Sequence, residues 1–219
     1  MKILKSFGAS LLILMLFSNT VLAASADSVA EAGGIATDDA IEVEQSYEFS
    51  SEYGYKYYIA VCHNTTDTDL DVSWDTVSYD KDGGILETGS SYTAYVTGGQ
   101  EFVLYALFLD SEDATDYSYK ISWEESDYIH PGFKDVTLQA NVASNGKLIL
   151  QATNNGSEDL STIQASTLFF DASDKLVGFE DSYIVNSNYN VLAGETVIKD
   201  LSIPEGADHY ETYYTAYRW

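Results

Sequence analysis

Short runs of alternating apolar and polar residues fill most of the chain from Tyr47 onward. Valine, isoleucine, threonine and aromatic residues recur within these runs, and glycine, asparagine, aspartate and serine separate them. The alternation is clearest over residues 70–74 and 147–153, where every second side chain would share one face of a strand. No stretch has the repeat of an amphipathic helix. The pattern therefore predicts an all-β protein.

The boundaries of the predicted strands follow from the turn residues between the runs. Asn145-Gly146 favours a two-residue hairpin, and the turn at 82–84 serves two strands in the same way. The predicted strands are residues 47–50, 55–63, 69–79, 85–95, 101–109 and 117–123 in the first half, and 135–142, 147–153, 160–171, 176–184, 196–203 and 210–218 in the second.

The two halves of this pattern repeat one another. Residues 64–86 reappear as 155–177, with asparagine and hydroxyl residues, an alternating segment, an aromatic-aspartate pair and a polar turn in the same order. Similarity at a fixed offset is typical of duplicated structural units, and each unit would bury its own apolar residues. The predicted equivalent pairs are Asn64 with Asn155, Cys62 with Thr153, Val72 with Ile163, Tyr79 with Phe170, Asp80 with Asp171, Gly99 with Gly194 and Trp123 with Trp219.

Several short strands in each unit, with no helix to cover a sheet, favour a two-sheet sandwich of immunoglobulin-like form. A small barrel is the alternative architecture. The sequence thus predicts two tandem immunoglobulin-like β-sandwich domains, at residues 45–124 and 135–219. Pro131-Gly132 and the acidic residues before it mark a linker at 125–134.

The N-terminal residues are typical of a secretory signal peptide. Lys2 and Lys5 precede an apolar run at 11–17 and then small residues, so we predict a signal peptide at 1–26 with cleavage after Ala23 or Ala26. The apolar run is shorter than the roughly 20 residues that span a membrane, so no membrane insertion of the mature chain is expected. Residues 27–44 are small and acidic and predict a flexible leader.

The charge of the chain restricts its partners. Its formal net charge is -25 at pH 7, which excludes the counterion release that drives nucleic-acid binding and opposes docking on anionic membranes. Such a charge favours solubility and attracts basic partners. Cys62 is the only cysteine, so the fold has no internal disulfide. We interpret Cys62 as an ordinary strand residue, with a reactive thiol as the alternative.

The order of motifs in each repeat resembles the FxLYD-type domains of secreted bacterial proteins. The resemblance consists of the asparagine with nearby hydroxyl residues, a valine or isoleucine strand, the aromatic-aspartate pairs at 79–80 and 170–171, and the glycine turns at 98–100 and 193–195. It covers nearly all of both repeats, although other residues stand at the Phe and Leu positions of the namesake motif. The resemblance implies immunoglobulin-like sandwiches in an extracellular setting, mostly without an assigned activity.

Tyrosine dominates the aromatic residues, with 18 tyrosines against 9 phenylalanines and 3 tryptophans. A tyrosine ring presents a flat apolar face and a hydroxyl, so it can stack on sugars or anchor a protein partner. Tyrosine also suits half-buried strand positions, which is the structural alternative. The candidate ligand-binding residues are Tyr53, Tyr55, Tyr92, Tyr95, Tyr213 and Tyr217.

Two acidic turns are candidate metal sites. Asp80 and Asp82 stand at alternate positions before a glycine, as the carboxylates of calcium loops do, and Asp171 and Asp174 occupy the equivalent turn. Aspartate and glycine also favour hairpin turns through local hydrogen bonds and backbone freedom. We therefore predict no cofactor, with bound calcium as the alternative.

The sequence predicts a protein without catalytic activity. Its three histidines lack zinc-ligand spacing, and neither a nucleophile elbow nor a phosphate-binding glycine loop occurs. We predict a secreted bacterial surface or extracellular interaction protein that presents tandem modules in adhesion, envelope association or an accessory assembly role. The partner would be a protein or a glycan. The alternatives are a carbohydrate-binding module that uses exposed tyrosines and a calcium-stabilised structural spacer.

Overall fold

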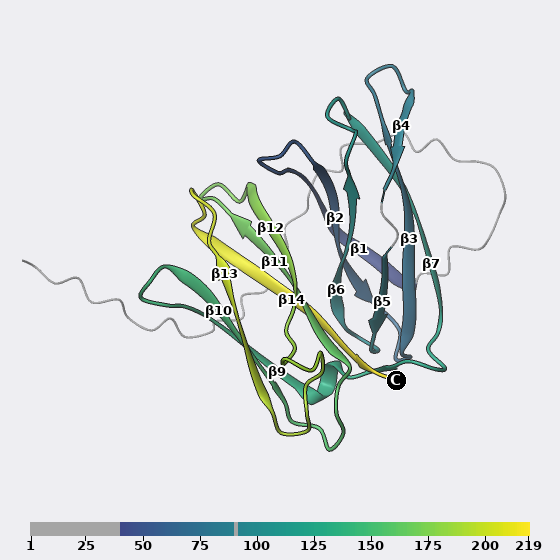
Figure 1. Ribbon diagram of the computed structural model, residues 1–219. Helices are drawn as coiled ribbons and strands as arrows, with labels where there is room; N and C mark the ends of the chain where they lie inside the picture. The colour runs from purple at the N-terminus through teal and green to yellow at the C-terminus, as the bar shows by residue number, and fades with distance from the viewer. Residues whose placement is uncertain (1–39, 90–91) are drawn as a thin grey trace, which may run out of the picture. The chain divides into compact units, whose positions relative to one another are not determined.

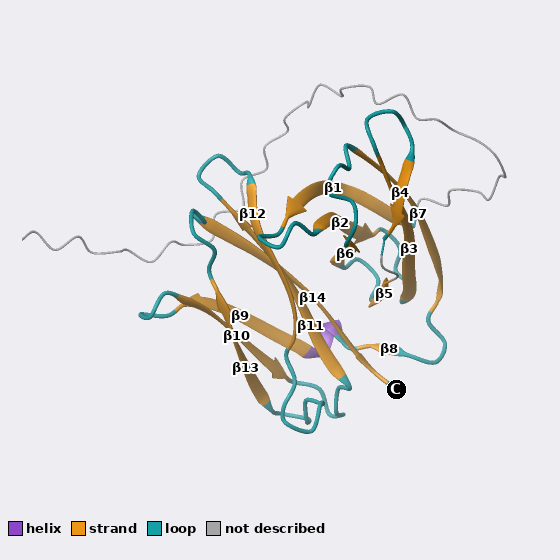
Figure 2. Ribbon diagram, turned by 45° about the horizontal axis from the view of Figure 1, so that its top comes forward, coloured by secondary structure: helices purple, strands orange, loops and turns teal. Residues whose placement is uncertain are grey.

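The computed structural model describes residues 40–89 and 92–219. The predicted signal peptide and residues 27–39 of the predicted leader lie outside this part of the chain. The described residues form antiparallel strands and one short 3-10 helix, with no α-helix among them. The all-β prediction is confirmed, and the paired sheets agree with a β-sandwich architecture (Figure 1 and Figure 2).

The first half contains two sheets that enclose an apolar core. Strands β1, β2 and β6 form one sheet in that order, whereas β3 pairs with β4, β5 and β7 in the other. Trp74, Phe102 and Phe108 are the largest fully buried side chains between them, and the Trp74 indole donates to the carbonyl of Tyr105 at 3.1 Å. The strands are β1 (Ile41–Ser50), β2 (Lys56–Asn64), β3 (Leu70–Tyr79), β4 (Ile85–Thr88), β5 (Tyr92–Val96), β6 (Glu101–Phe108) and β7 (Asp116–Glu125).

The second half also contains two sheets that enclose an apolar core. One sheet has the order β13-β10-β9 and the other the order β12-β11-β14-β8. Leu148 and Leu150 of β10 pack against Ile163 and Phe169 of β11 in the core between them. The elements are β8 (His130–Pro131), η1 (Phe133–Asp135), β9 (Val136–Val142), β10 (Lys147–Asn154), β11 (Thr162–Phe170), β12 (Leu176–Tyr183), β13 (Thr196–Ser202) and β14 (His209–Arg218).

A buried asparagine organises one corner of the first half. Asn64 ends β2, and its Nδ2 donates to the carbonyls of Thr68 and Thr97 at 2.9 and 3.0 Å. Its Oδ1 accepts the backbone N–H of Thr66 at 3.1 Å. Gly99 has a φ of 75° and donates its N–H to the Asn64 carbonyl, so a glycine suits that position. These bonds satisfy backbone groups that the turn leaves without strand partners.

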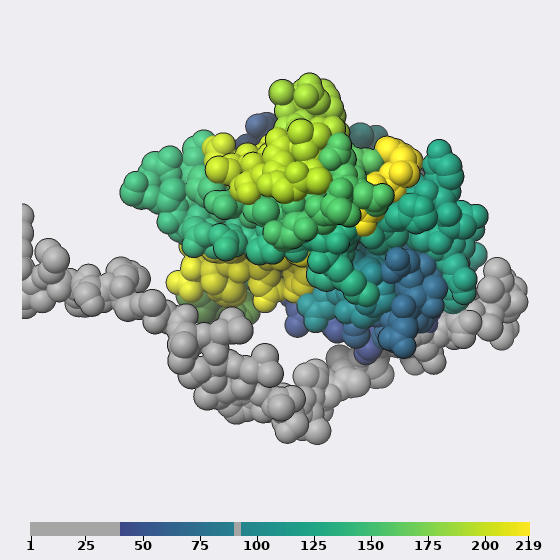
Figure 3. Space-filling model, turned by 90° about the horizontal axis from the view of Figure 1, so that it is seen from below, coloured from purple at the N-terminus to yellow at the C-terminus, as the bar shows by residue number. Residues whose placement is uncertain are grey.

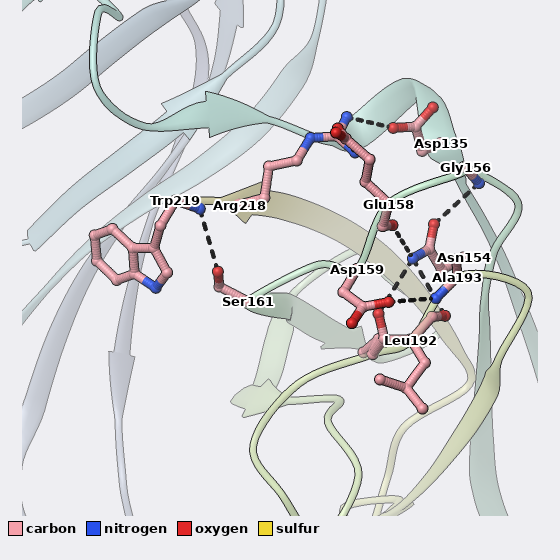
Figure 4. A network of polar contacts seen from close by, with 11 residues as sticks. Asp135, Asn154, Gly156, Glu158, Asp159, Ser161, Leu192, Ala193, Arg218 and Trp219 are labelled. Carbon is pink, nitrogen blue, oxygen red and sulfur yellow. Dashed lines mark hydrogen bonds and ion pairs between the residues drawn. The ribbon is translucent and has the colours of Figure 1, made fainter.

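The same corner occurs in the second half around Asn154. Its Nδ2 donates to the carbonyls of Glu158 and Val191 at 2.9 and 3.1 Å, and its Oδ1 accepts the N–H of Gly156 at 3.0 Å (Figure 4). Gly194 has a φ of 76° and donates its N–H to the Asn154 carbonyl. The predicted equivalence of Gly194 with the glycine of the first corner is therefore confirmed.

The predicted equivalence of Asn64 with Asn155 is wrong by one residue. Asn154 is the corner residue, whereas the Asn155 side chain makes exposed bonds. Asp80 and Asp171 keep their predicted equivalence, because the Oδ1 of each accepts backbone N–H groups two and four residues farther along. The second half thus has one extra residue between its corner and this turn.

Two other predicted equivalences change as well. Cys62 lies two residues before its corner asparagine, so its counterpart is Ala152 rather than Thr153. Trp123 pairs with Val72 of β3, and the residue at the corresponding place in the second half is Ala216, which pairs with Ile163. Trp219 lies beyond the end of β14 and has no equivalent role.

A third apolar cluster joins the two pairs of sheets. Ile59 and Val61 of β2 and Val103 of β6 pack with Leu168 and Phe170 of β11. Alternate residues of β2 face the core of the first half, so this strand contributes to two clusters. All nine residues of β11 are buried, which means that both faces of this strand are covered. The sequence predicts separate cores for the two halves, and the structure adds a shared one.

Some predicted boundaries need correction. Strand β1 begins at Ile41, so residues 41–44 are strand rather than flexible leader. The predicted linker at 125–134 contains the end of β7, the short strand β8 and the start of η1, and β8 pairs with β14. The predicted strand at 85–95 is two strands, β4 and β5, on either side of residues 90 and 91.

Candidate functional site

The predicted aromatic site residues lie in several separate places. Tyr53 and Tyr55 lie in the turn between β1 and β2, where their rings contact each other at a centroid distance of 6.3 Å and Tyr53 is 76% exposed. Tyr95 of β5 meets Tyr217 of β14 edge to face at 4.8 Å. Tyr213 packs against the third apolar cluster. The backbone of Tyr92 pairs with Trp74. The structure therefore does not gather the six predicted residues into one site.

An open pocket of about 660 Å³ does contain one of them, Tyr217. Tyr183 from the end of β12 and Tyr189 from the following loop line it as well, and Asn186, Ile198 and Lys199 complete much of the wall. We call this the tyrosine pocket. Tyr183 is 58% exposed and Tyr189 is 82% exposed. Its volume lies within the roughly 300 to 1,000 Å³ of most small-molecule sites.

The loop that carries Tyr189 is held by Asn186. The Oδ1 of Asn186 accepts the backbone N–H of Asn188 at 2.8 Å, and its Nδ2 donates to a carboxylate oxygen of Glu195 at 2.9 Å. Glu195 also accepts the N–H of Leu192 at 2.7 Å. The pocket loop is thus tied to the asparagine corner of the second half. The yellow-green chain that follows β12 projects from the surface in Figure 3.

Tyr189 has an unusual backbone conformation. Its φ is 60°, a left-handed value that is rare for bulky residues and is favoured by glycine and asparagine. Asparagine, which adopts a positive φ more easily than tyrosine, stands on both sides of it at positions 188 and 190. The left-handed conformation nevertheless falls on the tyrosine. Strain of this kind is frequently found at binding sites. The structure keeps a bulky exposed ring at the one loop position where such a ring is unfavourable.

Further aromatic rings continue from the pocket at Tyr217. The ring of Trp219 contacts that of Tyr217 at 5.5 Å, and Tyr128 contacts Trp219 at 6.4 Å. The backbone around Trp219 is fixed by its N–H, which donates to the Oγ of Ser161 at 3.3 Å. Arg218 forms ion pairs with Asp135 and Glu158, and the Trp219 ring points away from this network (Figure 4).

The aspartates of the two acidic turns make local contacts. Asp80 and Asp171 use their Oδ1 atoms to accept backbone N–H groups of their own turns. Asp82 is exposed beside Lys81, and Asp174 pairs with His209 at 3.4 Å. Among the described residues, no group of three or more histidine, cysteine, aspartate or glutamate side chains is placed to hold a metal ion. The turns are hairpin turns capped by aspartate.

Cys62 is a buried strand residue. It has no exposed surface, and its Sγ lies 3.8 Å from the carbonyl of Ala60. Burial raises the pKa of the Cys62 thiol to about 12. Because the thiolate is the reactive form, the thiol is inert in the folded chain. The interpretation of Cys62 as an ordinary strand residue agrees with this environment.

A half-buried carboxylate lies beside the shared apolar cluster. Asp181 of β12 accepts hydrogen bonds from Gln164 and Ser166 of β11 at 2.6 and 2.7 Å, and from the hydroxyl of Tyr105 in the first half at 3.3 Å. Burial raises the pKa of Asp181, and the three hydrogen bonds oppose this effect without cancelling it. Asp181 thus links the two halves through a polar contact at the edge of the apolar one.

We expect the stability that Asp181 contributes to fall as the pH rises. Its pKa in the folded state lies above the ordinary value of about 3.9. The contribution is therefore complete below that ordinary value and is lost as the pH rises through the raised one. The free energies of unfolding of the wild type and of Asp181→Asn can be measured between about pH 3 and pH 7. The value of the wild type should fall relative to that of the variant as the pH rises. A constant difference, or one that grows with pH, would contradict this assignment.

Tyr183 and Tyr189 are not among the site residues predicted from the sequence. Both lie outside the segments in which tyrosines cluster along the sequence, so clustering alone does not identify them as site residues. The available signal was a tyrosine among asparagines at 186–190, where the other residues are typical of a turn. An aromatic residue in such a segment has no strand or core to explain it.

Comparisons with known proteins add no family to this description. No protein-family model matches the chain, and no curated protein has a similar sequence. In the part of the chain that the structure describes, none of the helices has the length and apolar character needed to cross a membrane. The candidate site therefore depends on the geometry of the tyrosine pocket itself.

Proposed function

We propose that this chain is a secreted bacterial interaction protein without catalytic activity, built of two tandem immunoglobulin-like modules, and that it binds its partner at the tyrosine pocket. The observation that carries the proposal is the pair of exposed rings, Tyr183 and Tyr189, at an open pocket of about 660 Å³. Exposed tyrosines at a concave surface are typical of binding sites, because they offer large contact areas with little loss of side-chain entropy.

The repeated asparagine corner supports the tandem part of the proposal. Asn64 and Asn154 make equivalent bonds in two pairs of sheets that each enclose a core. A duplicated module explains why two distant segments share such a detail. The immunoglobulin-like form and the FxLYD-type resemblance are parts of this proposal, and so is export, which depends on the signal-like residues 1–26.

The chemistry of the pocket supports binding over catalysis. Among the described residues that line it, Lys199 and the tyrosines are titratable, whereas carboxylates and imidazoles are not represented. Acid-base catalysis near neutral pH generally uses histidine, aspartate or glutamate in the cleft. The lining instead combines ring faces with hydroxyl, amide and ammonium groups, which suits recognition.

Expression of the full sequence in a bacterial host tests the proposal. We expect an exported chain that lacks its first 23 or 26 residues by mass spectrometry. The purified protein should bind isolated bacterial cell envelopes saturably, and the double variant Tyr183→Ala/Tyr189→Gly should bind at least about ten-fold more weakly, which is about 1.4 kcal/mol. Tyr53→Ala is the matched control, because Tyr53 is an exposed ring that does not line the pocket.

Three results would contradict separate parts of the proposal. An unprocessed chain that stays in the cytoplasm would contradict export. Envelope binding that is absent, or equally strong in the double variant, would contradict the assignment of the site. Turnover of envelope material by the purified protein, lost in the double variant, would contradict a function without catalysis.

A further inference from the structure

We propose that the tyrosine pocket binds a neutral oligosaccharide, with sugar rings stacked on Tyr183, Tyr189 and Tyr217 and sugar hydroxyls bonded to the polar groups between them. This inference depends on the proposed function and names the ligand class of the same site.

The three rings combine apolar faces with hydrogen-bonding edges. Tyr183 and Tyr189 line the pocket, and both side chains are mostly exposed. Tyrosine hydroxyls and ring faces are thus both available at the surface. A sugar ring has the complementary character, because its C–H groups form an apolar face and its hydroxyls lie around the edge. A purely apolar ligand would leave the polar wall without partners.

The conformation of Tyr189 indicates that its ring serves a purpose other than folding. A left-handed backbone at φ 60° costs roughly 1 kcal/mol or more for a residue other than glycine, and an 82% exposed ring gains little from burial in return. The bonds of Asn186 to the loop and to Glu195 hold this geometry in place. A ring that is pre-positioned in this way loses less entropy on binding.

The charges of the protein decide between classes of ligand. A net charge of -25 disfavours anionic polymers. The net charge of the whole protein would attract a basic peptide, but Lys199 lines the pocket, so such a peptide would meet a like charge at the site itself. A neutral ligand with many hydroxyl groups avoids both forms of repulsion, and it can use the ammonium group and the amide and hydroxyl side chains as bonding partners.

The aromatic rings beyond the pocket favour an oligosaccharide over a single sugar. Tyr217 contacts Trp219 at 5.5 Å, and Trp219 contacts Tyr128 at 6.4 Å. Trp219 is 68% exposed, and Tyr128 is exposed as well. A ligand of several linked sugars could therefore extend from Tyr217 along this row. Multiple stacking contacts compensate for the weak attraction of each one.

Titration with defined neutral oligosaccharides tests the inference. The probes are hexasaccharides of glucose, xylose, mannose and N-acetylglucosamine, with polygalacturonate as the anionic probe and a lysine-rich peptide as the basic one. Isothermal titration calorimetry of the full protein should show binding of at least one neutral hexasaccharide. Tyr189→Gly should weaken it at least about ten-fold and leave the melting temperature unchanged or raised, because glycine adopts a positive φ without strain. Tyr53→Ala should bind like the wild type.

Each outcome decides the inference. Binding that is lost in Tyr189→Gly and retained in Tyr53→Ala would support it. No binding of any neutral hexasaccharide at millimolar concentration would overturn it, as would binding that Tyr189→Gly leaves unchanged, or binding of polygalacturonate or the peptide alone. If the neutral probes fail while envelope binding is still lost in the pocket variants, the proposed function stands with another ligand class. If envelope binding fails as well, the proposed function fails with it.

Discussion

Replacing Leu168 with aspartate is expected to uncouple the two halves of the protein and to destabilise it strongly. Leu168 is fully buried in the apolar cluster that the two pairs of sheets share. Leu168→Ala should lower the free energy of unfolding by about 2 to 5 kcal/mol, and Leu168→Asp by more, since it also buries an unpaired charge. Denaturant unfolding followed by tyrosine fluorescence should change from one cooperative transition to two, because the shared cluster no longer couples the halves.

The control for this experiment is Ile85→Asp. Ile85 is 69% exposed on β4, so the same type of change should alter the free energy of unfolding by no more than about 0.5 kcal/mol. Val61→Asp approaches the shared cluster from β2 and should reproduce the uncoupling from the opposite side. A single unchanged transition in both Leu168→Asp and Val61→Asp would show that the shared cluster does not couple the halves.

The second large effect is expected at the repeated asparagine corner. Asn154→Ala removes the partner of the Glu158 carbonyl and of the Gly156 N–H, which are both partly buried, and each such group left unpaired costs about 1 to 3 kcal/mol. The free energy of unfolding should therefore fall by about 2 to 6 kcal/mol. Asn64→Ala should have a similar effect, because the same bonds occur in the first half. Urea denaturation of both variants measures the two values.

Asn155→Ala is the matched control in the neighbouring position. The bonds of its side chain to Thr137 and to the backbone are exposed, so the substitution should cost about 1 kcal/mol or less. The comparison tests the corrected register directly, because the sequence alone makes Asn155 the equivalent of Asn64. A larger effect at Asn155 than at Asn154 would contradict the structural equivalence described above.

Much of the fold could be predicted because its strands alternate. Residues 147–153 place Leu148, Leu150 and Ala152 on one face, and these three residues are buried in a core. The turns at Asp80 and Asp171 can also be predicted from the sequence, since aspartate caps its own turn through local hydrogen bonds. Local signals of this kind act within a few residues, so a single sequence contains them.

The remaining features depend on contacts that the sequence does not encode locally. Adjacent asparagines at 154 and 155 are chemically identical, so only the hydrogen bonds of the folded corner distinguish them. Leu168 and Phe170 belong to three consecutive apolar residues at the end of β11. Such residues indicate that both faces of the strand are covered there, but not what covers the second face. The position of Tyr189 likewise depends on a backbone angle that is visible only in the folded loop.

The residue that follows the turn glycine differs between the two corners, with Gln100 in the first half and Glu195 in the second, and the difference relates to their surroundings. Gln100 accepts the N–H of Thr97 through its Oε1, and its Nε2 donates to the carbonyl of Tyr214 in the second half at 2.9 Å. Glu195 accepts the equivalent N–H and also a bond from Asn186 of the pocket loop. An amide suits the first corner because it must donate there, whereas a carboxylate suits the second because it only accepts.

The complete burial of β11 has a consequence for proteolysis of the protein. A cut in the segment after β7 would separate two fragments, and each would then expose to water an apolar sheet face that the intact chain covers, with Leu168 and Phe170 on one side and Ile59 and Val61 on the other. Exposed apolar strands of this kind promote aggregation. Limited digestion is therefore expected to give precipitation, or a nicked pair that stays associated, in place of two independent soluble fragments.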